Sequence, residues 1–453
     1  MRPLVHEALP GSVLEGVSWP AMPGGEGAAM LAMQFQFAQS ERWPADMLRA
    51  AQFAQLTLLL RHARATVPFY RERLAAIDLS GPLTPDAFSS LPLLRRQDLQ
   101  DRFADLCSTA VPPDHGRVHE GQTSGSTGRP VRFRATELNG LFWRAFTLRD
   151  HLWHRRDFSG KLAVVRGRVK SGESPGWGPS TDVAFRTGPS VTRGVDCTVA
   201  EQAAWLSRER PQYLLTIPAN AGALAGYCEA RGIRFPGLRE LRTYGEALHP
   251  DLRRQVSAAW GVPLTDLYSC SELGYLALQC PGQEHYHVQS EGVYLELLNA
   301  AGRHCAPGES GRVVVTSLHN FAMPLIRYDI GDYAEAGEHC SCGRSLPVIR
   351  RILGRVRNML RLPGGGLRSP RFGETQFTAI APVRQFQVVQ RSLEDIEVLL
   401  VAARPLTADE ESALRALILR NLGHPFSVRF SYREDIPRTA SGKYEEFRSE
   451  VAA

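Results

Sequence analysis

A loop rich in hydroxyls and glycines is the first segment of this chain that could do chemistry. Residues 123–128 read Thr-Ser-Gly-Ser-Thr-Gly, followed by Arg-Pro. Glycines let a backbone approach a polyphosphate closely, and hydroxyl and amide N–H groups donate hydrogen bonds to its oxygens. The Gly-x-x-x-x-Gly-Lys spacing of a Walker loop is absent, which argues against a P-loop ATPase or kinase. Taken alone, the loop is equally well interpreted as a flexible Gly/Ser turn.

Cysteine and histidine residues in two distant segments predict a metal site. Cys340 and Cys342 stand in one Cys-Ser-Cys-Gly turn, and Cys280 precedes His285 and His287 in the other. Three thiolates and one imidazole form a closed tetrahedral zinc site, which is structural because no coordination position stays open. We predict Cys280, His287, Cys340 and Cys342 as ligands, with His285 as the alternate. Reduced buried cysteines without a metal are the other interpretation.

Elements of an α/β protein must position these segments. The chain has 453 residues, which favours two or three structural units. Residues 44–78 show helical spacing of apolar residues, whereas the first forty or so residues look looser. From 160 to 335, short apolar runs alternate with helical patterns, as in an α/β domain. After about residue 354, strand, strand, helix and strand patterns indicate a smaller α+β unit.

Composition narrows the class of protein. Hydrophobic residues make up 43% and charged residues 22%, as in ordinary globular proteins. The net charge of +6 comes without long like-charged blocks, so it does not imply nucleic-acid binding. The first residues lack the apolar run of a secretory signal, and no apolar stretch reaches the roughly 18 residues of a membrane-spanning helix. We therefore expect a cytoplasmic protein that binds neither nucleic acid nor membrane.

Six motifs in a fixed order raise the specificity of the phosphate loop. They are Thr-Ser-Gly-Ser-Thr-Gly-Arg-Pro at 123–130, Tyr-Gly-Glu-Ala-Leu at 244–248, Tyr-Ser-Cys-Ser-Glu-Leu-Gly at 268–274, Arg-Tyr-Asp-Ile-Gly-Asp at 327–332, Gly-Arg-Val-Arg-Asn-Met at 354–359 and Pro-Arg-Thr-Ala-Ser-Gly-Lys at 437–443. With these motifs the chain resembles the adenylate-forming superfamily of acyl-CoA synthetases, adenylation domains and luciferases. Within it, the chain looks like the phenylacetate-CoA ligase and CapK-like branch. The resemblance runs from about residue 50 to the carboxyl end.

The resemblance implies a fold and two domains. We expect an α/β protein with a large multi-layer N-terminal domain of mixed sheets and helices over residues 1–354. A small, mobile α+β domain over residues 355–453 would act as its lid. The family's hinge residue is commonly Asp or Lys, and this chain has Arg357 there. The glycine-rich stretch at 360–370 also departs from the branch's pattern, so recognition of the acceptor stays open.

The resemblance also assigns the site residues. The residues that would hold the ATP phosphates are Thr123, Ser124, Gly125, Ser126, Thr127 and Gly128. Those expected beside the adenine and nearby are Gly245, Glu246, Ala247, Tyr268 and Ser269. Glu272 would bind Mg²⁺, a hard cation that takes one or two oxygen ligands from protein in such sites. Asp332 would accept hydrogen bonds from both ribose hydroxyls, with Arg355 at the edge of the site. Lys443 would neutralise carboxylate and α-phosphate oxygens as charge develops between them.

The function that follows is ATP-dependent adenylation of a small carboxylic acid, with Thr127, Glu272 and Lys443 in catalytic roles. The acyl group would then pass to a thiol, and the resemblance favours coenzyme A. Two alternatives stay open: an enzyme that loads an acyl or peptidyl carrier protein or an amine, and a zinc-stabilised nucleotide-binding protein without catalysis. Residues 176–220 are expected to border the pocket for a small aromatic or apolar acid. The sequence leaves open whether the protein is a monomer or a homodimer.

Overall fold

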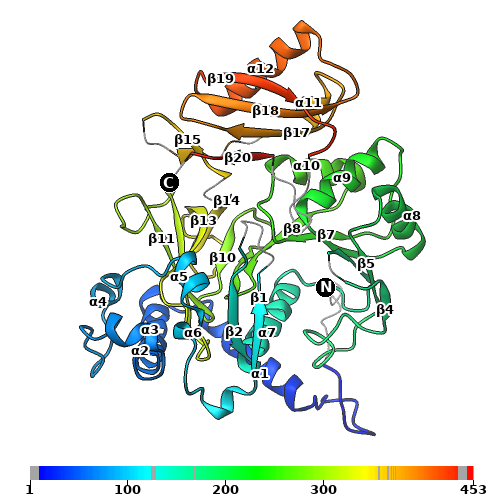
Figure 1. Cartoon of the computed structure of the whole chain (residues 1–453). Coiled ribbons are helices and arrows are strands. Elements are labelled where there is room, and N and C mark those ends of the chain that lie inside the picture. The colour runs from blue at the N-terminus through cyan, green and yellow to red at the C-terminus, as the bar shows by residue number, and fades with distance from the viewer. Residues whose placement is uncertain are drawn as a thin grey trace.

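The computed structural model describes residues 10–123, 129–167, 169–355, 358–364, 367–368, 370, 372, 374–436 and 446–451. Its largest element is a twelve-stranded sheet in the order β11-β12-β13-β14-β10-β9-β8-β7-β6-β3-β5-β4. The strands are β3 (Leu162–Arg166), β4 (Gly172–Ser174), β5 (Ser190–Gly194), β6 (Tyr213–Thr216), β7 (Glu240–Tyr244), β8 (Leu264–Cys270), β9 (Gly274–Gln279), β10 (Tyr286–Val288), β11 (Val293–Leu298), β12 (Ser310–Ser317), β13 (Tyr328–Ala336) and β14 (Val348–Arg355). The predicted α/β fold class is confirmed (Figure 1).

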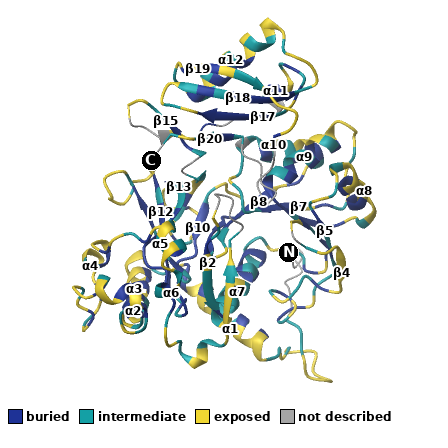
Figure 2. Ribbon diagram, viewed as in Figure 1, coloured by how far each residue is buried: buried dark blue, intermediate teal, exposed yellow. Residues whose placement is uncertain are grey.

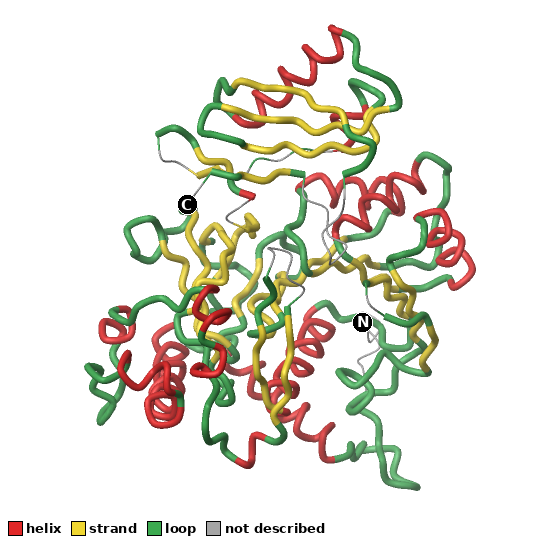
Figure 3. The backbone as a smooth tube through the Cα atoms, viewed as in Figure 1, coloured by secondary structure: helices red, strands yellow, loops and turns green. Residues whose placement is uncertain are grey.

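Strand β8 joins two halves of this sheet. On one side β8, β7, β6, β3 and β5 pair in parallel, and on the other β8 through β14 to β11 pair antiparallel. Parallel neighbours need crossover connections, which are α8 (Val199–Glu209), α9 (Pro218–Glu229) and α10 (Pro250–Trp260). The carboxyl end of β8 therefore lies where the two strand arrangements meet. Figure 3 shows the strands of the sheets in yellow and the helices that cover them in red.

Local sequence explains where the crossover helices begin. At α8, the Thr198 side chain accepts a hydrogen bond from the Glu201 N–H while the Glu201 carboxylate accepts one from the Thr198 N–H. This reciprocal pair satisfies two N–H groups at the start of the helix. Helices α9 and α10 begin with Pro218 and Pro250 at their first helical positions, where a missing N–H costs nothing. Their buried faces pack on the parallel strands in one continuous apolar core.

A second layer covers the antiparallel half. It contains α2 (Ala45–Thr66) and α3 (Pro68–Arg73), which fall in the predicted helical region 44–78. Pro68 separates the two helices, because the residue before a proline is driven out of helical geometry. The shorter elements are α4 (Pro85–Ser89), α5 (Arg96–Asp101), α6 (Phe103–Leu106), the 3₁₀ turn Pro113–His115, and the hairpin β1 (Val118–Gln122) with β2 (Arg132–Thr136).

Residues 25–40 correct one expectation. They form α1 (Gly25–Ser40), although the sequence pattern suggested a looser start. The helix packs on α7 (Glu137–Trp153), where the Phe37 and Phe146 rings stack at 5.0 Å. Gly27 lies so close to the backbone of Val183 that an added Cβ would meet its carbonyl oxygen. Apolar residues on several sides of α1 and glycines at its start hide the helical period that the sequence analysis looked for.

The carboxyl-terminal part forms a smaller sheet in the order β19-β18-β17-β20. Its elements are β17 (Val383–Gln390), β18 (Asp395–Ala402), β19 (Ser427–Tyr432), β20 (Phe447–Ser449), α11 (Glu374–Thr378), α12 (Ala408–Leu422) and the short pair β15 (Leu360–Arg361) and β16 (Leu367–Arg368). Phe372, Phe386, Leu414 and Ile418 lie in a core of its own. Figure 2 shows the buried strands of this sheet under α12, whose outer face is exposed. The boundary at 354/355 and the mobility of this part stay predictions.

In the described part of the chain, no helix combines the length and hydropathy that crossing a bilayer requires.

Candidate active site

Three charged or polar side chains meet at the carboxyl end of β8. Asp332 on β13 stands directly opposite Arg355 on β14 in the antiparallel register. The Tyr268 hydroxyl donates to Oδ2 of Asp332 at 2.9 Å, and Nε of Arg355 lies 2.9 Å from Oδ1. The sequence placed these three residues in separate motifs, and the fold brings them into direct contact.

The contacts with Tyr268 and Arg355 fix the orientation of the Asp332 carboxylate but use only part of its capacity to accept hydrogen bonds. An ionised carboxylate has about four lone-pair positions, and the two described partners use one on each oxygen. Burial, followed by the charge of Asp332, raises the pKa of Tyr268 well above its usual value, so its hydroxyl stays protonated and donates. The Asp332 charge likewise raises the pKa of Arg355. The carboxylate can therefore accept further hydrogen bonds from a pair of neighbouring hydroxyls.

Glu272 lies in the turn between β8 and β9 (Gly274–Gln279) and is 8% exposed. Burial raises the pKa of its carboxyl group, while Arg355 and Arg96 partly oppose that shift. A buried carboxylate held by distant cations, without a full ion pair, is suited to binding a hard cation. Nearby, the buried Tyr328 hydroxyl has no hydrogen-bond partner among the described residues.

The segment 245–247 approaches this group from the parallel half. Gly245 follows β7 with a φ of +79°, a left-handed conformation that favours glycine. Ala247 faces Gly354 so closely that an added Cβ there would sit 3.4 Å from the Ala247 Cβ. The Glu246 carboxylate accepts a hydrogen bond from the N–H of Ala219 at the start of α9, at 2.9 Å. Two of the predicted motifs are thus in contact.

The described end of the phosphate loop is anchored at the β1–β2 hairpin. The Thr123 N–H donates to the Val131 carbonyl, and the Val131 N–H donates to the Thr123 hydroxyl at 3.0 Å. Ser269 is half-buried on β8 opposite Tyr275. The remaining predicted residues lie outside the described part of the chain: Ser124, Gly125, Ser126, Thr127, Gly128, Arg357 and Lys443.

Helix α5 is a part of the site that the sequence analysis missed. Gln100 and Arg96 both donate side-chain hydrogen bonds to the carbonyl of Arg129, at 2.6 and 3.2 Å. Arg129 in turn forms an ion pair with Asp101 at 2.7 Å. The helix therefore holds the carboxyl-terminal end of the 123–128 loop and places Arg96 near Glu272. In the sequence, the Arg-Gln-Asp-Leu-Gln-Asp segment at 96–101 is indistinguishable from an ordinary solvated helix.

A small cavity of about 200 Å³ adjoins Glu272. Its aromatic walls come from Phe142, Trp143 and Phe146 on α7 and from Tyr275 on β9. The Phe142 ring stacks on His319 with centroids 4.0 Å apart. None of the residues 176–220, which the sequence analysis placed beside the acid, lines this cavity. The elements packed against a helix determine whether its side chains face a cavity or the core. The sequence of α7 therefore gives no sign of a cavity.

Polar groups in the wall of this cavity are satisfied within the protein. His319 Nε2 lies 2.8 Å from the Glu291 carbonyl oxygen, and burial lowers the pKa of His319 to about 4, so the ring is neutral at pH 7. The Asn320 side chain donates to the Arg134 carbonyl and accepts from two backbone N–H groups. Apart from Glu272, no described residue in the cavity wall carries an ionised group.

The fold brings the cysteine and histidine segments together beyond the carboxyl end of β9, which pairs antiparallel with β8. Cys280 and Cys340 place their sulfurs 3.8 Å apart, and the Cys342 sulfur lies 3.3 Å from Nε2 of His287. Tetrahedral zinc with ordinary bond lengths separates two sulfurs by about 3.8 Å and a sulfur and nitrogen by about 3.6 Å. The observed spacings therefore suit four ligands around one zinc ion.

The environment of each ligand also fits a metal. Nδ1 of His287 lies 3.3 Å from the Leu346 carbonyl oxygen, which leaves Nε2 facing the sulfurs. Burial lowers the pKa of His287 to about 4, so the ring is neutral and can ligate. His285 also comes within 4.8 Å of Cys280, His287 and Cys340, and its buried Nε2 has no described hydrogen-bond partner. His285 and Cys342 thus remain rivals for the fourth position.

Comparison with known proteins places this geometry in a family. The model of the CapK C-terminal domain matches residues 370–449. Phenylacetate-coenzyme A ligase of Thermus thermophilus is 26% identical over 441 residues, covering 89% of this chain and 96% of that protein. The Escherichia coli phenylacetate-coenzyme A ligase is 25% identical over 372 residues, covering 76% and 80%. These matches confirm the resemblance to the phenylacetate-CoA ligase and CapK-like branch of the adenylate-forming superfamily.

Solved structures agree with the fold of this protein. A 2-hydroxyisobutyryl-CoA ligase in the postadenylation state, in complex with 2-HIB-AMP, aligns with a TM-score of 0.71 at 19% identity, covering 91% of this chain and 92% of that one. An open conformation of that ligase, in complex with 2-HIB-AMP and CoA, aligns with a TM-score of 0.61 at 19% identity, covering 92% and 94%. Both alignments include the larger and the smaller sheet.

Proposed function

We propose that this protein activates a small carboxylic acid with ATP as an acyl-adenylate and then transfers the acyl group to the thiol of coenzyme A. The observation that carries the proposal is the contact of Tyr268, Asp332 and Arg355 beside the buried Glu272. Tyr268 and Glu272 come from one family motif, and Asp332 and Arg355 come from two others. The names of the relatives, all ligases that form coenzyme A thioesters, support the same reaction.

In this proposal the nucleotide lies along the carboxyl ends of the central strands. The two free lone-pair positions of Asp332 accept hydrogen bonds from the ribose hydroxyls. Residues 245–247 lie against the adenine, and the 123–128 loop holds the phosphates. Glu272 would hold Mg²⁺, which neutralises phosphate charge when it is bound. Arg96, placed near Glu272 by α5, adds a positive charge on the same side.

Adenylation requires the acid's carboxylate oxygen to attack the α-phosphorus while pyrophosphate leaves. No covalent bond to the protein is needed, so the protein contributes position and charge compensation. Lys443 is the residue we assign to the charge that develops between the carboxylate and the α-phosphate. Its role follows from the terminal Ser-Gly-Lys motif alone. In the second step, the coenzyme A sulfur attacks the acyl carbon and AMP leaves.

The acid occupies the cavity beside Glu272 in this proposal. An apolar cavity of about 150 Å³ holds one benzene molecule, and this cavity measures about 200 Å³. Phe142, Trp143, Phe146 and Tyr275 contribute aromatic rings to its walls, and Glu272 is the only ionised group among the described residues that line it. We therefore propose an uncharged acyl group with a single aromatic ring or a short branched chain. An acid with a second carboxylate would find no cationic partner among the described residues of the wall.

We further propose one structural zinc ion, held by Cys280, His287, Cys340 and Cys342, with His285 as the competing fourth ligand. The ligands come from the β9–β10 turn, from β10 (Tyr286–Val288) and from the turn before β14. Zinc would therefore fasten two segments sixty residues apart in sequence. Because four protein ligands leave no open position, the ion has no part in the reaction.

Two measurements test this function in sequence. A pyrophosphate-exchange screen over aryl, short-chain and amino acids should give exchange with small uncharged aryl or branched acids. Release of AMP is then measured with coenzyme A, with an acyl carrier protein and with an amine. We expect coenzyme A to be used. If AMP is released only with the carrier protein, the acceptor is the carrier protein and not coenzyme A. If no acid supports pyrophosphate exchange, the proposed adenylation is contradicted.

A further inference from the structure

A second, much larger cavity lies at the opposite end of β8 from the candidate active site. Its volume is about 1190 Å³. Leu264 and Thr265, the first residues of β8, line it, whereas Tyr268 and Glu272 lie at the other end of the strand. The end of α7 and the turn after Cys280 complete its walls. The proposed adenylation reaction uses no part of it.

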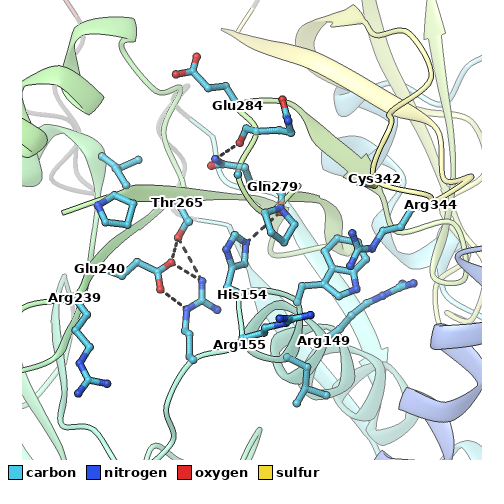
Figure 4. Close-up of a pocket in the computed structure, with 18 of the residues that line it drawn as sticks. Arg149, His154, Arg155, Arg239, Glu240, Thr265, Gln279, Glu284, Cys342 and Arg344 are labelled. Atoms are coloured by element: carbon cyan, nitrogen blue, oxygen red, sulfur yellow. Dashed lines mark hydrogen bonds and ion pairs between the residues drawn. The ribbon is translucent and has the colours of Figure 1, made fainter. Parts of the chain in front are cut away.

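Arginine dominates the wall of this cavity. The described arginines that line it are Arg42, Arg149, Arg155, Arg156, Arg239, Arg253 and Arg344. In Figure 4, Arg149, Arg344 and Cys342 lie on one side, Arg239 and Glu240 on the other, and His154 and Arg155 between them. Burial lowers the pKa of His154, so the histidine adds no charge at pH 7.

Carboxylates already neutralise most of this positive charge. Arg149 contacts Glu41 at 3.0 Å and Glu291 at 2.8 Å, and Arg344 lies 3.3 Å from Glu41. The other pairs are Arg156 with Asp150 and Glu240, Arg239 with Asp157, and Arg253 with Glu284. Arg242, behind the wall, shares Asp150. These arginines are therefore balanced within the protein and mainly hold the wall in shape.

Arg42 and Arg155 are the exceptions. Both are exposed, and neither pairs with a carboxylate in the described part of the chain. Arg42 lies beside the Cys340–Cys342 turn, since an added Cβ on Gly343 would be 3.9 Å from its Nη1. Two uncompensated guanidinium groups on one cavity give it a local charge of about +2, which favours anions. Guanidinium groups bind phosphate and carboxylate through paired N–H donors.

The backbone at Arg155 strengthens this interpretation. Arg155 has a φ of +48° just after the end of α7, where glycine is the usual residue. A left-handed conformation is less favourable for a side-chain-bearing residue than for glycine. The chain nevertheless places an arginine there, facing the cavity. The buried Nε–H group of Arg149 also lacks an acceptor among the described residues.

We propose that this cavity is a second ligand site, which binds a small molecule carrying at least two acidic groups, phosphate or carboxylate. Arg42 and Arg155 bind the acidic groups, and the paired arginines supply further N–H donors. The inference stands apart from the proposed function, because it rests on residues at the other end of the sheet.

The test uses the full chain with pyrophosphate and citrate as probes, one for each kind of acidic group. Hydrogen exchange locates binding, and calorimetry measures affinity. We expect slower exchange at residues 152–156 and 281–284 with at least one probe. Arg155→Gly and Arg42→Ala should each weaken that binding by about tenfold or more, because each removes a charge-assisted contact. Response to one probe alone identifies the acidic group.

The matched control is Arg210→Gly. Arg210 also follows a helix with a φ of +48° and is exposed, but it does not line the cavity. Both glycine variants relieve the same backbone conformation and should fold, so melting temperature checks them directly. Equal binding by Arg155→Gly and Arg210→Gly would overturn the proposal. Protection confined to residues near Thr123 and Glu272 would overturn it as well, since pyrophosphate would then bind at the active site alone.

Discussion

Replacing Tyr268 with phenylalanine tests how the nucleotide site is organised. The change removes one hydroxyl and keeps the ring, so the buried volume around β8 is nearly unchanged. The Tyr268 hydroxyl is one of two described donors that hold Asp332, at 2.9 Å, and Arg355 is the other. After the change, Arg355 still fixes Oδ1 of Asp332, while Oδ2 loses its donor. The carboxylate can then rotate away from the ribose.

The size of the effect follows from the kind of hydrogen bond that is lost. A hydrogen bond to a charged group contributes about 1.5–3 kcal/mol, and about 1.4 kcal/mol corresponds to a tenfold change in affinity. Because Arg355 remains, we expect the lower part of that range. The KM for ATP should rise about tenfold, and kcat should change by less than about threefold, since no reacting atom is touched.

Pyrophosphate exchange at varied ATP concentration measures both constants, and Tyr286→Phe is the matched control. The Tyr286 hydroxyl donates to the buried Asp266 at 2.8 Å on a part of the sheet away from the nucleotide. Both variants should lose stability to a similar extent, by a few degrees in melting temperature at most, since about 1 kcal/mol shifts the melting temperature of a chain of 453 residues by roughly 1 °C. Equal KM values for ATP in the two variants would refute the reasoning.

Three further predictions concern metal, pH and the lysine. Cys340→Ser should abolish the one zinc ion bound per chain. It should also lower the melting temperature more than the control Cys305→Ser does, because Cys305 lies outside the cluster. Metal analysis that finds no zinc in well-folded wild-type protein would contradict this prediction. Burial raises the pKa of Asp266 from 3.8 to about 6. The folded state therefore binds the Asp266 proton more tightly than the unfolded state does. Protonated Asp266 adds roughly 3 kcal/mol to the free energy of unfolding below pH 4, and this stabilisation is lost as the pH rises through about 6. Asp266→Asn cannot ionise, so its melting temperature relative to wild type should rise from pH 5 to pH 7, and a constant difference would remove Asp266 from that role. Lys443→Ala should slow ATP-dependent ligation about a hundredfold or more but leave transfer of the acyl group from synthetic acyl-adenylate to coenzyme A nearly unchanged. Equal losses of rate in both assays would instead show a general effect on folding or binding.

Sequence motifs identified residues that the fold brings into contact, both at the proposed nucleotide site and in the Cys/His cluster. Their roles in binding a nucleotide and a metal stay predictions. Asp332 and Arg355 are on adjacent strands, and Tyr268 ends the central one, so motif residues far apart in sequence meet at one edge of the sheet. The distant Cys280 and Cys340 likewise meet, because the β9–β10 turn and the segment before β14 are neighbours.

The cavities and the supporting helices could not be predicted in the same way. Whether a residue of α7 lines a cavity or packs in the core depends on what the rest of the fold places opposite it. Phe146 stacks on Phe37 and also borders the proposed acid cavity. The sequence around Phe146 indicates neither of these two roles. Helix α5 presents an ordinary charged pattern, and its contact with Arg129 exists only in the folded protein.

Transfer of oxygen from the acid tests adenylation most directly. The acid is labelled with ¹⁸O in both carboxylate positions and incubated with ATP, Mg²⁺, coenzyme A and the protein, and the products are analysed by mass spectrometry. If the carboxylate attacks the α-phosphorus and the thiol then displaces AMP, one ¹⁸O atom appears in AMP and none in pyrophosphate. Label in inorganic phosphate, with ADP in place of AMP, would show an acyl-phosphate route and contradict the adenylate-forming function.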